Sequence, residues 1–263
     1  MKPAIRPAVA GVLAAQTPST TLIAREEPIE WFRHTMENAW LTPFDPTLID
    51  RWVSAELSYE EDRGGASTIE FKSSFRDAFH LHNGIGLGYQ LQVPLKQNDD
   101  GNSHVSGLGD FEARVGLVGR FLPTLRWGAG VNAKFDSASD PALGDQAFQL
   151  KSIFILRWDT TDRITLGIDA EYTFTPSDAG IYDVRTLELK FPFAVRLSGQ
   201  WAAGITYKPE WNFLTDDLEH TMDLGSSYTF GHDRHYVLSF GLELPLSEQD
   251  LEWKVSSGFT WHF

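Results

Sequence analysis

The sequence predicts an all-β fold, a single twelve-stranded antiparallel β-barrel that spans a membrane, preceded by a short N-terminal helical segment. Apolar and aromatic residues recur at every second position in twelve segments after Asp50, which is the period of a strand with two different faces. Most of these segments are long enough for a tilted transmembrane strand of about 9–11 residues. They are also longer than the roughly five or six residues of an ordinary strand.

The alternation is clearest at 84–95, where apolar side chains alternate with glycine and glutamine. A soluble β-sandwich also alternates, but here the second face is small, polar or charged almost throughout, which favours a wet lumen. The expected strands lie near 51–59, 67–76, 84–95, 110–121, 125–135, 147–158, 164–174, 183–191, 197–208, 220–230, 235–245 and 251–263.

The last segment, LEWKVSSGFTWHF, has one mostly apolar face and one mixed polar face, and it ends on Phe263. It resembles the closing strand of bacterial outer-membrane β-barrels, and the broader resemblance covers about residues 50–263. The resemblance implies a location in the bacterial outer membrane and contact with its lipid and lipopolysaccharide. It also implies insertion by the barrel assembly machinery, for which the terminal aromatic residue helps mark the chain.

The expected connections alternate in length, as they do in bacterial barrels with short periplasmic turns and longer external loops. Placing Phe263 at the periplasmic end puts the short links on that side. Two links depart from the rhythm, the short external turn near 247–250 and the longer turn at 77–83. The expected periplasmic turns are 122–124, 159–162, 192–195 and 231–234, and the expected long loops are 96–107, 136–146, 175–182 and 209–219.

Aromatic residues gather near the ends of the expected strands, as in the two girdles that meet lipid headgroups. The expected inner girdle contains Phe121, Trp158, Phe230, Tyr236, Trp261 and Phe263. The expected outer girdle contains Tyr59, Phe111, Phe135, Phe148, Tyr172, Tyr207 and Trp253.

The composition narrows the function classes. The chain has no cysteine, which excludes thiolate catalysis and cysteine metal sites. Its net charge of −14 argues against a nucleic-acid partner, which would favour a basic surface. We expect neither a cofactor nor a metal, although the acidic segment 98–102 offers oxygen ligands without the spacing of an EF-hand.

The chain divides into three expected regions. Residues 1–23 have the outline of a signal-peptide remnant or are disordered, and residues 50–263 form the barrel. Residues 24–49 are expected to form an amphipathic helical plug or a periplasmic segment. The apolar stripe of this helix, at spacings of three and four residues, consists of Ile29, Phe32, Met36 and Trp40.

Charged residues on the inward face fall into two groups. The periplasmic mouth is expected to be basic, with Arg76, Arg120, Arg126 and Lys190, and the acidic plug could dock there. Further up, charges of both signs predict cross-strand ion pairs, since buried charges are costly unless they are paired. These pairs either stiffen the barrel or form a constriction that selects solutes. The expected lumen and solute-binding residues are Glu112, Arg114, Lys134, Lys151, Arg157, Asp169 and Glu171.

Inward-facing glycines cluster on the third to fifth expected strands. Missing side chains would open space along this wall, so we expect a solute path there. The alternative is that these glycines only ease strand bending. The glycines are Gly84, Gly86, Gly88, Gly116, Gly128 and Gly130.

Two short motifs bear on function. The segment HLHNG at 80–84 resembles the His-x-Ser-Asn-Gly motif of outer-membrane phospholipase A, but His82 stands where that family has its serine nucleophile. The expected register also places this segment at the periplasmic end. Both departures argue against an enzyme.

The segment GLGDFEARVGLVGRF at 107–121 resembles the strand entry of the outer-membrane transporter family named after the meta pathway of phenol degradation. That resemblance implies uptake of small solutes, hydrophobic or aromatic ones among them. The expected function is therefore a channel or transporter for passive passage of small-molecule solutes through a charged lumen. The alternatives are a structural or partner-binding barrel with a closed lumen and, less favoured, a lipid-modifying enzyme.

Overall fold

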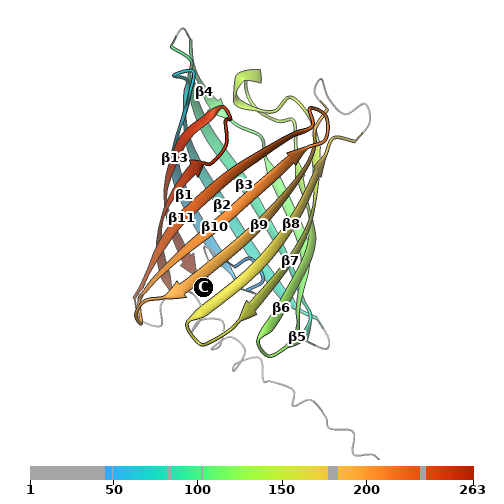
Figure 1. Ribbon diagram of the computed structural model, residues 1–263, viewed down its shortest axis with the longest axis vertical. Coiled ribbons are helices and arrows are strands. Elements are labelled where there is room, and N and C mark those ends of the chain that lie inside the picture. The colour runs from blue at the N-terminus through green and yellow to red at the C-terminus, as the bar shows by residue number, and fades with distance from the viewer. Residues whose placement is uncertain (1–44, 49, 82–83, 102, 177–182, 232–234) are drawn as a thin grey trace, which may run out of the picture.

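The computed structural model of the 263-residue chain describes residues 45–48, 50–81, 84–101, 103–176, 183–231 and 235–263. These residues form one antiparallel sheet that closes into a barrel (Figure 1). No helix among them is long and apolar enough to cross a bilayer. The expected helix with Ile29, Phe32, Met36 and Trp40 lies outside the described residues, as does the expected region 1–23.

Each strand pairs with its neighbours in the chain, and β1 pairs with β13 to close the sheet. β4 and β5 both pair with β3 and together form one interrupted strand, so the barrel has twelve strands and the predicted fold class is confirmed. The strands are β1 (Trp52–Asp62), β2 (Ser67–His80), β3 (Gly86–Asp99), β4 (His104–Leu108), β5 (Glu112–Leu122), β6 (Leu125–Lys134), β7 (Gln149–Asp159), β8 (Ile164–Phe174), β9 (Arg185–Arg196), β10 (Trp201–Asn212), β11 (Asp217–Phe230), β12 (Tyr236–Pro245) and β13 (Leu251–His262).

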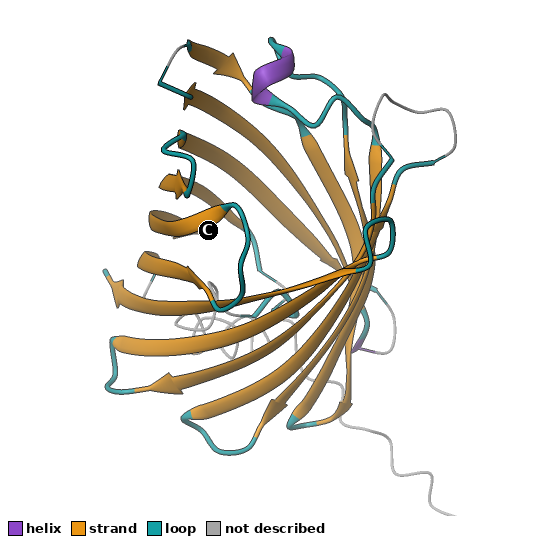
Figure 2. Cartoon of the chain, turned by 45° about the horizontal axis from the view of Figure 1, so that its top comes forward, coloured by secondary structure: helices purple, strands orange, loops and turns teal. Residues whose placement is uncertain are grey.

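The connections separate the two ends of the barrel. One end, which we call the loop end, carries the connection between β6 and β7 with the 3-10 helix η3 (Pro141–Leu143) at the rim (Figure 2). The opposite, short-turn end carries the turns that follow β5, β7 and β9. The start of β1 pairs with the end of β13 at this short-turn end, where Trp52 lies opposite His262.

Two expected loops are wrong because the strands continue through them. The expected link at 96–107 contains the end of β3 and most of β4, which pair from Leu95 opposite Leu108 to Asp99 opposite His104. The expected link at 209–219 likewise contains paired residues of β10 and β11. These stretches are too polar for their sequence to predict membrane strands. The two strands of a hairpin nevertheless stay hydrogen-bonded up to the turn, because the turn fixes their register.

The expected turn at 192–195 is also wrong. β9 continues to Arg196, and the turn follows at 197–200. Pro192 suggested a turn because proline lacks the N–H that a strand ladder uses. In the structure Pro192 is a buried strand residue opposite Thr206. Gly167 on β8 leaves space for Arg157 and for the ring of Pro192, since a Cβ on Gly167 would lie 2.6 Å from Arg157 Nη1 and 2.9 Å from Pro192 Cγ.

The outer face of the barrel is apolar and exposed along its length, which is expected of a surface that faces lipid. Aromatic rings contact one another at both ends of the wall. At the short-turn end Tyr236 stacks on Phe230 and Phe259. At the loop end the Tyr59 ring centroid lies 5.2 Å from that of Trp253.

The lipid-facing and lumen-facing sides of the barrel wall are expected to differ in how much a charged substitution destabilises the protein. Leu117, in the middle of β5, is 40% exposed on the outer face. Leu117→Arg is expected to lower the free energy of unfolding in lipid by about 2–4 kcal/mol, because an arginine at the bilayer midplane has no hydrated partner. Urea titration in lipid vesicles measures this change.

Gln92→Arg is the control, because Gln92 lies on β3 opposite Glu112, on the lumen side of the wall. We expect it to cost less than half as much as Leu117→Arg. Equal losses for the two variants would contradict the assignment of the faces.

Candidate functional site

Ion pairs cross between strands in the loop half of the lumen. The buried Glu171 carboxylate on β8 lies 3.0 Å from Lys151 Nζ on β7 and 3.0 Å from Lys190 Nζ on β9. Lys208 Nζ lies 3.0 Å from Asp223 and 2.6 Å from Glu243. One lumen cation thus links carboxylates from two other strands, so these ladders bind neighbouring strands together.

A buried aspartate shapes the loop end. Asp110, in the break between β4 and β5, is 1% exposed. Its carboxylate accepts hydrogen bonds from the backbone N–H groups of Ser137, Ala138 and Asp145, at 3.1, 3.0 and 2.7 Å. A Cβ on Gly144 would lie 2.6 Å from the same carboxylate. Asp110 therefore fixes the loop 136–146. The motif at 107–121, which contains Asp110, did not predict this role.

A polar vestibule lies beneath this loop at the loop end. It is a cavity of about 270 Å³ between the wall and residues 142–145. Lys254 Nζ forms an ion pair with Glu60 at 2.9 Å in its lining. On the loop side Asp145 contacts Lys134 Nζ at 2.5 Å. The vestibule is thus walled by charges of both signs.

The chain before β1 lies inside the barrel near the short-turn end. Asp45, Thr47 and Leu48 are 1%, 4% and 6% exposed. Leu48 packs with Ala194 and Ala202, which face inward from β9 and β10. Residues 45–48, which we call the inner segment, therefore fill part of the lumen rather than lying beneath it.

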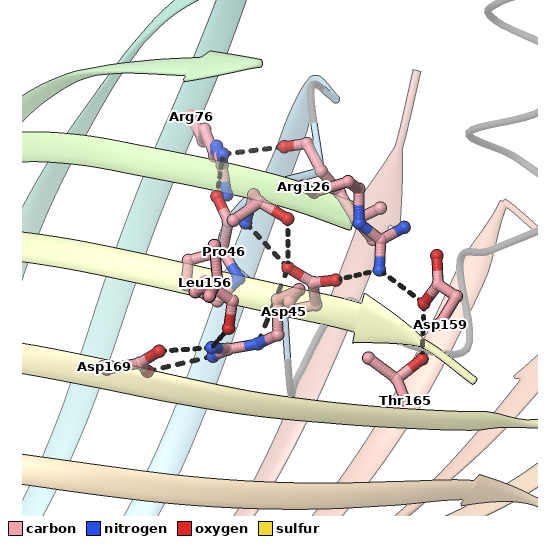
Figure 3. Close-up of polar contacts among 11 residues, drawn as sticks. Asp45, Pro46, Arg76, Arg126, Leu156, Asp159, Thr165 and Asp169 are labelled. Atoms are coloured by element: carbon pink, nitrogen blue, oxygen red, sulfur yellow. Dashed lines mark hydrogen bonds and ion pairs between the residues drawn. The ribbon is translucent and has the colours of Figure 1, made fainter. Parts of the chain in front are cut away.

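The carboxylate of Asp45 anchors the inner segment (Figure 3). Its Oδ2 lies 2.7 Å from Arg126 Nη2, and its Oδ1 lies 3.9 Å from Arg157 Nε. The backbone N–H and the hydroxyl of Thr47 donate to Oδ1 at 2.8 and 2.6 Å. Burial acts to raise the pKa of Asp45, but the two guanidinium groups and the Thr47 hydrogen bonds outweigh it and lower that pKa below its ordinary value.

Three arginines hold the inner segment, and we call Arg76, Arg126 and Arg157 the arginine clasp. Arg76 Nη2 donates to the carbonyl oxygens of Pro46 and Leu48 at 2.8 and 2.7 Å. The segment is therefore held through its backbone as well as through Asp45.

The remaining contacts of the clasp go to acids on the barrel wall. Arg126 Nη2 also contacts Asp159 Oδ1 at 2.9 Å, and that oxygen accepts from the Thr165 hydroxyl at 2.7 Å. Arg157 makes a two-point contact with Asp169, in which Nη2 lies 2.9 Å from Oδ2. Such bidentate pairs fix a guanidinium in one orientation.

A second cavity lies on the glycine-rich wall, next to the inner segment. It measures about 60 Å³ and is lined by glycines of β3, β5 and β6, by Val118 and by Ile153 and Ile155 of β7, with Pro46 on one side. Ile155 lies opposite Gly128, and Ile153 lies opposite Gly130. We call this space the glycine cavity. Its position matches the wall on which the sequence predicts a solute path, and the passage of a solute stays a prediction.

The structure brings together some of the expected site residues and separates others. Arg76, Arg126 and Arg157 meet at the inner segment, whereas Arg120 is exposed at the end of β5. Lys190 lies higher on the wall, beside Glu171 and Glu188. The other expected lumen residues occupy separate places: Glu112 accepts from Asn132 at 2.9 Å, Lys134 contacts the loop, Lys151 joins the Glu171 pair, Asp169 holds Arg157, and Arg114 lines the glycine cavity.

Sequence reasoning did not single out Asp45, Thr47 or Asp110. The Asp45-Pro46-Thr47 triplet carries a local signal, since aspartate commonly accepts hydrogen bonds from residues just after it in a turn. Within the described ranges, no group of His, Asp and Glu side chains is arranged to hold a metal ion.

No protein-family model matches this sequence, and no curated protein matches it significantly. Its structure is similar to that of an outer membrane channel from Pseudomonas putida F1, with a TM-score of 0.67 and 12% identity over 83% of this chain and 99% of that chain. It is similar to the CymD monoaromatic hydrocarbon channel, with a TM-score of 0.57 and 9% identity over 86% and 93% of the two chains.

It is also similar to outer membrane phospholipase A from Escherichia coli, with a TM-score of 0.51 and 12% identity over 86% and 97% of the two chains. At these identities the likeness concerns the fold, and it confirms the predicted fold of bacterial outer-membrane β-barrels. Channels and an enzyme share this fold, so the fold alone does not define the function, and the side chains of the lumen carry the functional information.

The docking of the inner segment should depend on the charge of Asp45. Since its pKa is lowered when docked, the stabilisation is complete above the ordinary aspartate value of about 3.9 and is lost as the pH falls through the lowered value. Asp45→Asn at neutral pH should speed amide exchange in the inner segment, residues 45–48, by about tenfold to a hundredfold, because a charge-assisted hydrogen bond contributes about 1.5–3 kcal/mol.

Hydrogen exchange with mass spectrometry, corrected for intrinsic exchange rates, measures both effects. Asp217→Asn changes the same charge at an exposed position of β11 and should leave amide exchange in residues 45–48 unchanged. Unchanged protection in Asp45→Asn would show that Asp45 does not anchor the segment.

Proposed function

We propose that this chain is a passive channel of the bacterial outer membrane for small solutes, with the short-turn end facing the periplasm. The observation that carries the proposal is a closed barrel with an apolar outer wall whose charged lumen contains two cavities. A barrel of twelve strands lies between eight-stranded barrels, whose side chains fill the interior, and porins of 16–18 strands, which leave an open aqueous channel.

The geometry supports a route along the lumen from one cavity to the other. A solute enters the polar vestibule at the loop end and passes the ion-pair ladders around Glu171. It then reaches the glycine cavity beside Arg114 and leaves past the arginine clasp. In this reading Glu112, Lys134 and Lys151 line the upper part of the route, and Arg157 and Asp169 line the lower part.

Residues 24–49 act in this proposal as a plug. The inner segment already occupies the short-turn end of the lumen through Asp45 and Leu48. The acidic residues that precede Asp45 in this segment would add to its electrostatic attraction to the basic residues of the periplasmic mouth. Release of the inner segment would widen the exit without any change in the barrel wall.

The apolar wall and its aromatic rings fit contact with outer-membrane lipid and lipopolysaccharide. The barrel assembly machinery would insert such a chain. These partners belong to the proposal because they follow from the class of fold.

A structural barrel with a closed lumen is the second candidate, and the position of the inner segment favours it. A lipid-modifying enzyme has less support. His80 is exposed at the end of β2, and residues 82–83, which complete the motif similar to that of outer-membrane phospholipase A, lie outside the described residues. We propose that the chain is not an enzyme.

Single-channel recording in planar bilayers tests the proposal. The full-length protein, with its folded state checked by a boiled-versus-unboiled gel, should give discrete conductance steps. A folded barrel that gives no steps, either intact or without residues 24–49, would exclude a channel and support the structural barrel.

Deletion of residues 24–49 should raise the single-channel conductance, because it removes the inner segment from the lumen. The Asp217→Asn barrel with its N-terminal segment intact serves as the control and should conduct as the wild type does. Unchanged conductance after the deletion would remove the plug from the proposal and leave the channel.

A further inference from the structure

The glycine cavity combines an apolar wall with positive charge. Its apolar surface comes from Val118, Ile153 and Ile155. The charged side chains in its lining are Arg76 and Arg114, and no carboxylate among the described residues belongs to this lining. A cation would be repelled here, and a strongly hydrated ion would lose water against the apolar wall.

Arg114 differs from the clasp arginines, because no carboxylate of the described residues balances its charge. The clasp arginines contact Asp45, Asp50, Asp159 and Asp169. In the part of the chain that the structure describes, Arg114 has no carboxylate within 4.0 Å, and its buried Nε has no hydrogen-bond partner. Arg114 is half-buried, and its guanidinium keeps an unused donor and no nearby carboxylate, so this side chain is suited to receive an anion.

Packing explains only some of the glycines in the cavity. A Cβ on Gly130 would lie 2.6 Å from the carbonyl oxygen of Val115, and one on Gly116 would lie 3.0 Å from that of Ala129. A Cβ on Gly88 would instead meet a single atom within 4 Å, at 3.8 Å, and one on Gly128 would make only ordinary contacts at 3.5–3.6 Å. Glycine weakens a strand, and a Cβ would fit at both positions, so packing against the wall does not require glycine at either. At Gly88 the space in front of the backbone is open, and the packing of the barrel does not account for it.

The inner segment displays the same chemistry that the cavity offers. The Asp45 carboxylate is bound by arginines, and the adjacent Pro46 ring lines the glycine cavity. An apolar ring next to a carboxylate is thus already accommodated at this level of the lumen. At about 60 Å³ the cavity exceeds several-fold the roughly 10–15 Å³ that one water needs.

We infer that the glycine cavity binds small apolar monocarboxylates, with Arg114 receiving the carboxylate beside the positive charge of Arg76 and the glycine wall receiving the hydrocarbon body. This inference deepens the proposed channel and rests on it for its role in transport. Arg76 and Arg114 flank Gln90 in one row of the sheet, so both guanidinium groups approach the cavity from the same level. A neutral hydrocarbon offers no carboxylate to Arg114, and acetate has too small a hydrocarbon body to contact the apolar wall, so we expect both to bind more weakly.

Fluorine NMR of 4-fluorobenzoate with the full-length protein in lipid nanodiscs tests binding without requiring conductance. Empty nanodiscs correct for partition into lipid. The wild type should bind 4-fluorobenzoate, with benzoate competing and an equal concentration of acetate failing to compete. The cation 4-fluorobenzylammonium should show no binding.

Two variants locate the site, and one is the matched control. Arg114→Gln keeps hydrogen-bond donors but removes the charge, and it should weaken binding at least tenfold. Gly88→Leu fills the cavity from a position where a Cβ fits, and it should abolish binding. Arg163→Gln removes the same charge from an exposed turn and should bind as the wild type does. Each variant is tested for heat-modifiable gel migration, which identifies a folded barrel.

The outcomes separate this inference from the proposed function. Equal affinity in Arg114→Gln and the wild type, or equal binding of the cation, would overturn the inference. Conductance without 4-fluorobenzoate binding would also overturn it while leaving the channel intact. Binding that depends on Arg114 and Gly88 in a protein without conductance would support the site and overturn the channel.

Discussion

The closure of the sheet is the constraint on which the rest of the structure depends. Inside a bilayer every backbone N–H and C=O must find its partner within the protein, and the pairing of β1 with β13 removes the last open edges. Closure fixes which residues face lipid and which face the lumen. It also fixes the lumen width, since the diameter of a barrel follows from its number of strands. Twelve strands enclose more space than their inward side chains fill completely. The ladders, the inner segment and the two cavities all occupy that remaining space.

The lumen is narrow enough to bury several of its charges partly or fully, and burial makes an unpaired charge costly. Glu171 lies between two lysines from the flanking strands, so satisfying one carboxylate connects three strands. Asp45 joins Arg126 of β6 to Arg157 of β7 in the same way, but it comes from outside the wall. The position of the inner segment therefore follows from the charge balance of the barrel. Among the residues that the structure describes, Arg114 has no carboxylate partner, and this is the basis of the anion site inferred above.

The faces of the strands could be predicted from the sequence because the alternation of side chains is a local property of each strand. Several connections could be predicted as well, among them those at 122–124, 136–146 and 159–162. The break between β4 and β5 and the contacts inside the lumen could not, because they depend on distant residues. The break between β4 and β5 places Asp110 where it can bind Ser137 and Ala138, 27 and 28 residues later. Arg126 and Arg157 could be assigned to the lumen, but Asp45 lies 81 residues before Arg126. Nothing in either local pattern connects the two.

The glycine cavity shows how open space in a lumen can arise from a requirement of the fold. Gly116 and Gly130 allow the backbones of β5 and β6 to approach at a distance that no side chain would permit, and glycine commonly serves this purpose where a barrel wall bends. Their missing side chains leave the inner wall thin at that level. Gly88 extends this surface at a position where a Cβ would meet a single atom, at 3.8 Å, so packing does not require a glycine there. The cavity therefore has a part that the barrel needs and a part that packing does not explain, and a bound solute, as inferred above, would account for the second part.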